Sequence, residues 1–226
     1  MAKKNNKTEE QFAAVEETLT NTEQWVENNQ ALLMKVVFSV VGVIAIVLGY
    51  TKFVTEPKNN EAQSELFMAV NSFEKDSFNL ALNGDGQFYG FLDLIDEYGS
   101  TEAGNLANFY AGSCYLNLGD FDNAIEYLSK FKANDQLVSS VALGSLGDAY
   151  MNVGESNKAI NSWKKAASNS DNNFTAPLYM MRAAMALEEN GNFKEALSLY
   201  KNIKNNYSDS DQGRDIDKYI TRVSLK

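Results

Sequence analysis

Three stretches of the sequence share one pattern: FYAGSCYLNLGDFDNAIEYLSKF at 109–131, GSLGDAYMNVGESNKAINSWKKA at 144–166 and MRAAMALEENGNFKEALSLYKNI at 181–203. Each has a glycine at the same place, at intervals of 35 and 37 residues. The three glycines are Gly119, Gly154 and Gly191. Five residues after each glycine stands an alanine (Ala124, Ala159, Ala196), and four residues after the alanine stands a large side chain (Leu128, Trp163, Tyr200). Seven residues before each glycine stands a small residue (Gly112, Gly147, Ala184). Self-similarity at this period predicts a stack of similar helical units.

This pattern resembles the tetratricopeptide repeat, a helix-turn-helix of about 34 residues. Small residues allow the two helices of a unit to approach closely, and each glycine supplies a turn that needs φ > 0. We therefore expect repeats at 105–138, 140–173 and 177–210. The sequence departs from the family at Phe131 and Ile203, where a small residue is usual, and no proline closes any of the three units.

The flanks of the three repeats are also apolar at helical spacing. Residues 60–80 and 88–101 read as two helices of a degenerate first repeat, 60–101, separated by Asn83-Gly84-Asp85-Gly86. Residues 211–226 read as a capping helix, which a solenoid needs over its last apolar surface. The expected fold is thus all-α, with a solenoid over 60–226.

An apolar run, VVFSVVGVIAIVLGY, occupies 36–50 without a charge, and its flanks extend it to 32–54. With Lys35 and Lys52 snorkelling to the surfaces, this length matches the ~20 residues that cross a bilayer as a helix. A buried core helix is the alternative, as is a cleaved signal peptide. About 30 polar residues precede the run and no small-residue cleavage pattern or cysteine follows it, so an uncleaved anchor with a linker at 55–59 is favoured.

The acidic segment 1–31 precedes this run and is expected to be partly helical, with Thr20-x-x-Glu23 as a capping box that begins a helix through Trp25. The distribution of lysines favours a cytoplasmic N-terminus. Four lysines lie on the N-terminal side of the apolar run, and only two lie close to it on the C-terminal side (Lys3, Lys4, Lys7, Lys35; Lys52, Lys58). The chain is therefore expected to cross the membrane once, with the solenoid outside the cytoplasm. Within the span, Ala45 and Gly49 form a small-xxx-small pair that suits contact with another membrane helix.

Composition limits the chemistry. The chain has no histidine, one cysteine and a net charge of −10. Catalysis by Ser-His-Asp or Cys-His, an intramolecular disulfide and a cysteine metal cluster are therefore excluded, and nucleic acid is a poor partner. No phosphate loop is present, and Asp93, Asp96 and Glu97 read as a solvated helix face. We expect no enzyme activity, cofactor, metal or small-molecule substrate, and we expect Cys114 to be a buried structural thiol.

The stretch WVENNQALLMKVVFSVVGVIAIVLGYTKF, taken with the repeats, resembles the YfgM family of bacterial single-span tetratricopeptide proteins. That resemblance implies a bacterial inner-membrane protein with its N-terminus in the cytoplasm and its solenoid in the periplasm. It also implies an adaptor at the Sec translocon that couples translocation of secreted proteins to periplasmic chaperones. Its implied partners are Sec channel subunits, a membrane-anchored chaperone and translocating polypeptides.

The remaining function is protein binding, on the concave face that the first helix of each repeat lines. Helical stepping predicts this face to contain Tyr110, Ser113, Asn117, Ser145, Asp148, Asn152, Met181, Arg182 and Met185. Met181 and Met185 could instead pack against the capping helix.

Two other assignments of the same groove stay open. One is a scaffold for outer-membrane assembly or cell-wall synthesis. The other is an N-anchored receptor that faces the cytosol. A clamp for a carboxylate tail needs several cations, and only Arg182 supplies one, whereas the other clamp positions hold Phe109, Ser113, Ser145 and Leu178, so this receptor is disfavoured.

Overall fold

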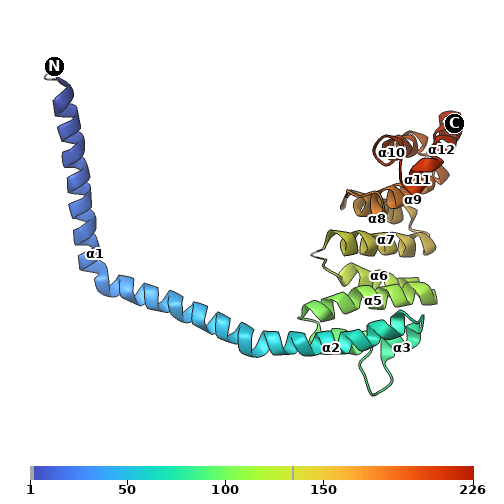
Figure 1. The fold of residues 1–226 in the computed structure, drawn as a ribbon, viewed down its shortest axis with the longest axis horizontal. Coiled ribbons are helices and arrows are strands. Elements are labelled where there is room, and N and C mark those ends of the chain that lie inside the picture. Colours follow the sequence, from blue (N-terminus) through green and yellow to red (C-terminus); the bar gives the residue numbers. More distant parts are fainter. Residues whose placement is uncertain (1–2, 134, 170) are drawn as a thin grey trace. The chain divides into compact units, whose positions relative to one another are not determined.

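The computed structural model describes residues 3–133, 135–169 and 171–226, and side chains from residue 25 onward with the exception of residue 27. Every regular element in these ranges is a helix (Figure 1). The chain divides into two compact units, Met1–Pro57 and Lys58–Lys226. The expected all-α class is therefore confirmed.

The first unit is helical along its described length. Helix α1 spans Lys3–Tyr50, a π turn follows at Thr51–Thr55, and α2 spans Glu56–Phe73. The first unit ends in α2, and most of this helix belongs to the second unit. The stretch Asn28–Phe73 contains a window long and apolar enough to cross a membrane, and no part of that window is buried. Among the described residues this is the one helix that meets both conditions.

Two boundaries differ from those expected from the sequence. The helix does not begin at Thr20, because α1 runs through that position from Lys3, and any cap by Thr20 or Glu23 lies outside the described side chains. Residues 55–59 are helical instead of a linker. The Glu56 amide donates to the Thr51 carbonyl five residues back, and this wide turn directly precedes Pro57, which has no amide to donate.

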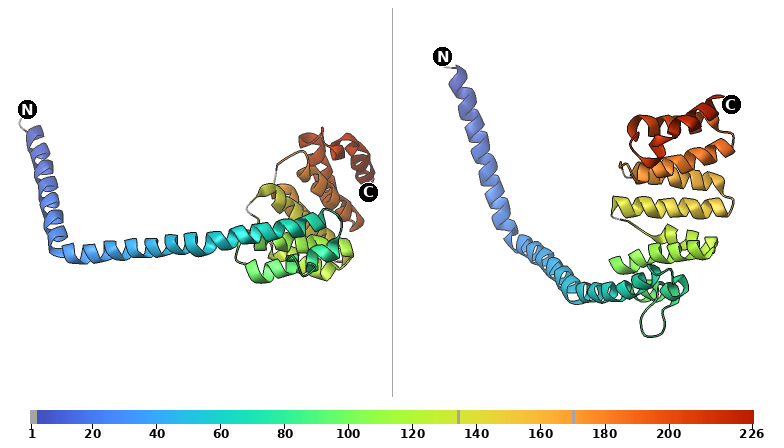
Figure 2. Two further views of the ribbon diagram at one scale, coloured as in Figure 1. Left: turned by 60° about the horizontal axis from the view of Figure 1, so that its bottom comes forward. Right: turned by 45° about the vertical axis from the view of Figure 1, so that its right-hand side comes forward.

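The second unit contains three helix pairs that stack in one direction (Figure 2). The pairs are α5 with α6, α7 with α8, and α9 with α10 (Glu102–Leu118, Phe121–Lys130; Gln136–Asn152, Ser156–Asn169; Thr175–Glu189, Phe193–Asn206). Asp120 and Asp135 cap α6 and α7 by accepting from the amides of Asn123 and Val138. Each pair corresponds to one expected repeat, but its first helix begins before the expected bound, at residues 102, 136 and 175 instead of 105, 140 and 177.

Glycines shape these pairs as the pattern predicted. Gly119, Gly154 and Gly191 have φ of +81°, +80° and +76° and form the turn inside each pair. A Cβ on Gly112 would lie 2.6 Å from Leu128, and a Cβ on Gly147 would lie 2.5 Å from the Trp163 ring. Both distances are too short for real contacts, so the close helix approach requires glycine.

The degenerate first repeat contains three helices where the sequence suggested two. After α2 come the short α3 (Phe78–Asn83) and α4 (Phe91–Tyr98). The break between α3 and α4 falls at the Asn83–Gly86 stretch named from the sequence. Phe73, Phe91 and Tyr110 pack together here, with Phe91 and Tyr110 stacked at 5.2 Å.

The C-terminal end is covered by α12 (Ile216–Ser224), which follows the short α11 (Asp211–Arg214). Ile216 and Val223 are buried, and Tyr219 and Ile220 pack against the C-terminal core. This helix covers the apolar surface of α10, which is the role expected of a capping helix.

Candidate protein-binding face

The first helices of the three pairs lie side by side. The backbone of α7 approaches both α5 and α9, whereas the second helices, α6, α8 and α10, do not come as close to one another. In a curved stack the closer row lies on the inner side, so α5, α7 and α9 line the concave face. We call the accessible side chains of these three helices the first-helix face.

At the α5 end, the three expected residues are poorly available. Tyr110 is half-buried between Phe73 and Phe91, and burial raises the pKa of its hydroxyl. Ser113 is buried and donates to the Phe109 carbonyl. Asn117 is exposed, but its amide donates to the Ser113 carbonyl one turn back. The structure therefore places Tyr110 in the core of the first repeat and leaves Asn117 as the accessible residue here.

The centre of the face contains an ion pair between adjacent repeats. Arg182 on α9 donates to both carboxylate oxygens of Asp148 on α7. The Trp163 indole donates to Asp148 Oδ1 at 2.9 Å and to the Gly144 carbonyl at 3.1 Å. The Arg182 guanidinium lies 5.8 Å from the centre of the Tyr179 ring. Two residues proposed as ligand contacts thus already satisfy each other.

The pair is partly open to solvent, with side-chain exposures of 40% for Arg182 and 29% for Asp148. Its surroundings are tightly packed, because a Cβ on Gly144 would lie 2.1 Å from the Tyr179 ring. Burial raises the pKa of the Tyr179 hydroxyl, with Arg182 acting in the opposite direction. A ligand on this face meets a rigid polar centre and not a free charge.

The other expected residues of α7 and α9 differ in availability. Ser145 is half-buried, and Asn152 is exposed with its amide on the Asp148 carbonyl. Met181 is half-buried against the C-terminal core. Met185 is 41% exposed and borders a cavity of about 510 Å³ together with residues of α9, α10 and the C-terminal end (Glu188, Glu189, Phe193, Arg222, Lys226). The structure therefore favours Met185 over Met181 as a contact residue.

Sequence reasoning missed a set of contacts between adjacent repeats. Asp148 pairs with Arg182, Ser156 with Asn190 and Glu188 with Arg222, each separated by 34 residues. This separation equals about one repeat length, so equivalent positions of neighbouring units face each other. The sequence signal for these contacts was a pair of complementary polar residues one repeat length apart. Such a pair can indicate a contact between repeats as well as a ligand site.

Ala45 and Gly49, the expected membrane contact, lie on the apolar part of α1. Ala45 is exposed, and a Cβ on Gly49 would meet no atom within 4 Å. Their small side chains leave this strip of the helix open to a close neighbour.

Nucleophilic or metal chemistry has little to build on in the described residues. No group of three or more acidic or cysteine side chains there could hold a metal ion. Cys114 is fully buried in α5, and burial raises the pKa of its thiol to about 12. At neutral pH this thiol is protonated and inert.

Comparisons with known proteins support the repeat assignment. The tetratricopeptide repeat family model matches residues 106–135 and 179–210. The middle copy is not matched, but α7 and α8 have the same glycine turn and close contact as their neighbours. No curated protein matches the sequence.

Among solved structures, a crystal structure of MamA is 16% identical, covers 70% of this chain and 92% of its own, and has a TM-score of 0.51. A kinesin-light-chain-type protein from Podosopora anserina with nearly identical TPR-like repeats is 14% identical, covers 74% of this chain and 86% of its own, and has a TM-score of 0.56. At these identities the similarity concerns the fold alone. With the two matched repeats, it identifies the second unit of the chain as a solenoid of tetratricopeptide type.

Proposed function

We propose that the protein is a membrane-anchored adaptor that binds a protein partner on its first-helix face. The observation that carries this proposal is the presence, in one chain, of a tetratricopeptide-type solenoid and a helix long and apolar enough to cross a bilayer. Solenoids of this kind present an extended surface for peptides or helices, and one anchor holds that surface beside a membrane.

The proposed location is a bacterial inner membrane, with the N-terminus in the cytoplasm and the solenoid in the periplasm. The lysine distribution around the apolar run supports this orientation. In this arrangement Ala45 and Gly49 dock the anchor against a neighbouring membrane helix, while the solenoid binds a soluble or translocating partner.

The proposed partners are Sec channel subunits, a membrane-anchored periplasmic chaperone and translocating polypeptides. Support comes from the resemblance of the segment around the anchor, and the exposed Met185 beside its cavity suits apolar peptide segments of varied shape.

A second candidate uses the same face to organise another envelope complex, in outer-membrane assembly or cell-wall synthesis. A receptor facing the cytosol is less well supported. Its clamp would need free cations, and Arg182 is already neutralised by Asp148.

Gentle-detergent purification of the tagged full chain tests the proposal. Recovery of channel subunits together with a periplasmic chaperone supports the translocon adaptor. Recovery of cell-wall enzymes or outer-membrane assembly factors alone supports the second candidate. Recovery of no protein under mild crosslinking contradicts both.

A variant on the first-helix face makes this test specific. Exchanging the charges of Asp148 and Arg182 is unsuitable, because it preserves their attraction and removes the acceptor of the Trp163 indole. Met185→Glu is better, since Met185 is exposed and borders the cavity. It should lower recovery of the soluble partner several-fold, whereas Ser198→Glu on the exposed side of α10 should leave recovery unchanged.

A further inference from the structure

Charge is distributed unevenly along the second unit. Residues 58–125 contain two lysines, Lys58 and Lys75, against eleven aspartates and glutamates. All eight described salt bridges lie further along the chain, between residues 126 and 222. The first two fifths of the second unit therefore have a strong negative potential that no described ion pair offsets, and such a field attracts cationic partners.

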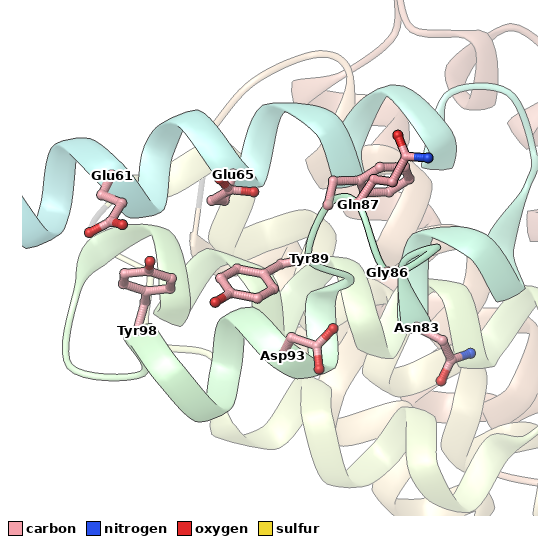
Figure 3. Close-up of a pocket in the computed structure, with 9 residues that line it drawn as sticks. Glu61, Glu65, Asn83, Gly86, Gln87, Tyr89, Asp93 and Tyr98 are labelled. Atoms are coloured by element: carbon pink, nitrogen blue, oxygen red, sulfur yellow. The ribbon is translucent and has the colours of Figure 1, made fainter.

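A cavity of about 400 Å³ opens within this acidic region (Figure 3). It lies between α2 and the segment that leads into α4, so its walls come from residues of the degenerate first repeat. Glu61 and Glu65 project from α2, and Tyr89, Asp93 and Tyr98 face them from the opposite side. The cavity thus combines three carboxylates with three aromatic rings, those of Phe88, Tyr89 and Tyr98.

The two tyrosines form a corner. Their ring centres lie 6.1 Å apart with the planes inclined at 54°. Tyr98 is only 4% exposed, and burial together with the nearby Glu61 carboxylate raises the pKa of its hydroxyl, whereas Tyr89 is 41% exposed. The Lys58 ammonium already lies 5.5 Å from the centre of the Tyr98 ring. Because Tyr98 is buried and already contacts Lys58, Tyr89 is the tyrosine ring open to a ligand cation.

The loop that completes the cavity is held in place by its own hydrogen bonds. Asp85 accepts from the amides of Gln87 and Phe88, and Asp93 accepts from the Gly90 amide at 3.2 Å. Gly90 is required, because a Cβ there would lie 2.2 Å from the Leu82 carbonyl oxygen. The cavity is accordingly preformed, which lowers the entropic cost of binding.

The lining selects the class of cation. The described acidic side chains form no group that could hold a metal ion, and the cavity is far larger than a bare ion. A planar guanidinium satisfies both features of the site, because it stacks on aromatic rings and pairs with carboxylates through two parallel hydrogen bonds. An ammonium group offers only a point charge.

We propose that this cavity, which we call the arginine pocket (Glu61, Glu65, Tyr89, Asp93, Tyr98), binds an arginine side chain of a basic, extended segment of a partner protein. It is a second interaction surface, at the opposite end of the solenoid from Met185. The surrounding acidic region steers the basic segment to the site, and the pocket selects arginine within it.

Binding of labelled peptides to the full chain in detergent micelles tests the proposal. The probe is a short fluorescein-labelled peptide with one central arginine flanked by lysines, measured by fluorescence anisotropy at low salt. Its partner probe has citrulline, the neutral counterpart of arginine, at the same place. The arginine peptide should bind at least about tenfold more tightly than the citrulline peptide.

Two double variants with equal loss of charge provide the control. Glu61→Gln with Glu65→Gln should weaken the arginine peptide about tenfold, because both carboxylates line the pocket. Glu74→Gln with Glu102→Gln removes the same charge from exposed positions outside it and should weaken binding less than about threefold. Tyr89→Leu should reduce the preference for arginine over citrulline.

Equal weakening by both double variants would overturn the proposal, since binding would then be diffuse electrostatic attraction. Displacement of the peptide by calcium chloride, but not by sodium chloride at the same ionic strength, would instead make the carboxylates a metal site and also overturn it. Met185→Glu should not change the affinity for the arginine peptide. The proposal for the arginine pocket and the proposal for the first-helix face can therefore be refuted separately.

Discussion

Single residues decide how closely the helices of this solenoid approach. Gly112 and Gly147 were identified from the alignment of the repeats as positions of close approach, and the structure places them against Leu128 and Trp163 of the second helix of the same pair. Gly144 was not identified, because its partner Tyr179 lies in the next repeat. Sequence periodicity predicts contacts inside a unit, but contacts between units depend on how the units stack.

Replacing Gly147 with alanine should destabilise the solenoid by about 1–3 kcal/mol, because overpacking a tight core forces helices apart. The added Cβ would lie 2.5 Å from the Trp163 ring. Urea unfolding of the full chain in micelles measures the loss. Ser145→Ala, at a half-buried position on the same helix, should change stability by less than about 0.5 kcal/mol. Similar losses for both variants would contradict the close-approach explanation.

Cys114 should resist labelling in the native protein. Its thiol is fully buried, and its pKa is raised to about 12. At neutral pH the reactive thiolate is therefore scarce and inaccessible. A bulky maleimide should react only after denaturation, as followed by mass spectrometry. Rapid labelling under native conditions would show that α5 is not packed as described.

At the scale of elements, the helices were predicted more reliably than their ends. The three repeats and the capping helix could be read from the spacing of small and large residues. The continuous helix across residues 55–59 could not, because Pro57 and the polar residues around it read as a break. A π turn directly precedes Pro57, which has no amide hydrogen to donate. The helix therefore continues through the proline without that backbone hydrogen bond.

The capping helix α12 is fastened to the last repeat by charge as well as by apolar packing. Arg222 donates to both oxygens of Glu188 on α9, at 2.7 and 2.6 Å, and the Tyr200 hydroxyl donates to the same carboxylate at 3.2 Å. The hydrogen bonds from Arg222 are the main reason that the pKa of Glu188 is lowered, and burial acts in the opposite direction. Glu188 is therefore charged in the folded state at pH values where it would begin to protonate in the unfolded chain.

This contact predicts a pH-dependent cap. A carboxylate with a lowered pKa contributes stability above its unfolded value of about 4.3, and the contribution is lost as the pH falls through the folded value. Because the Arg222 side chain is 51% exposed, we expect a contribution of only about 1 kcal/mol.

Hydrogen exchange of the α12 amides measures this effect. Protection of α12 should fall from pH 6 to below about 4 in the native chain. In the Glu188→Gln variant, the protection of α12 at pH 6 should be lower than in the native chain and should change less on acidification. Glu126→Gln, which removes an exposed pair with Lys130, is the control and should leave α12 unaffected. Equal pH dependence with and without Glu188 would show that other groups hold the cap.

At the scale of the whole molecule, the sequence alone predicted the combination of an apolar anchor and a solenoid. The candidate binding face was harder, because a helical stepping rule gives the side of a helix and not the partners of a side chain. Asp148 and Arg182 satisfy that rule yet bind each other, whereas the cavity lined by Glu61 and Tyr98 lies outside the repeats on which the rule was applied.

The orientation of the chain in the membrane follows from the proposed adaptor role. Protease added to intact spheroplasts should degrade the C-terminal solenoid, because it is proposed to lie outside the cytoplasm. A tag at residue 226 reports the cleavage, and a cytoplasmic marker protein confirms that the membrane is intact. Survival of the solenoid until the membrane is lysed would place it in the cytoplasm and contradict both envelope functions.

The central claim, that an anchored solenoid binds a protein partner on its first-helix face, is tested most directly by site-specific photo-crosslinking in native membranes. One photoreactive residue replaces Asn152 on α7, and another replaces Asn161, which is equally exposed on α8. We expect discrete crosslinked partners from position 152, lost on adding Met185→Glu, and none from position 161. Crosslinks from position 161 alone, or equal and unaffected crosslinks from both positions, would contradict the account.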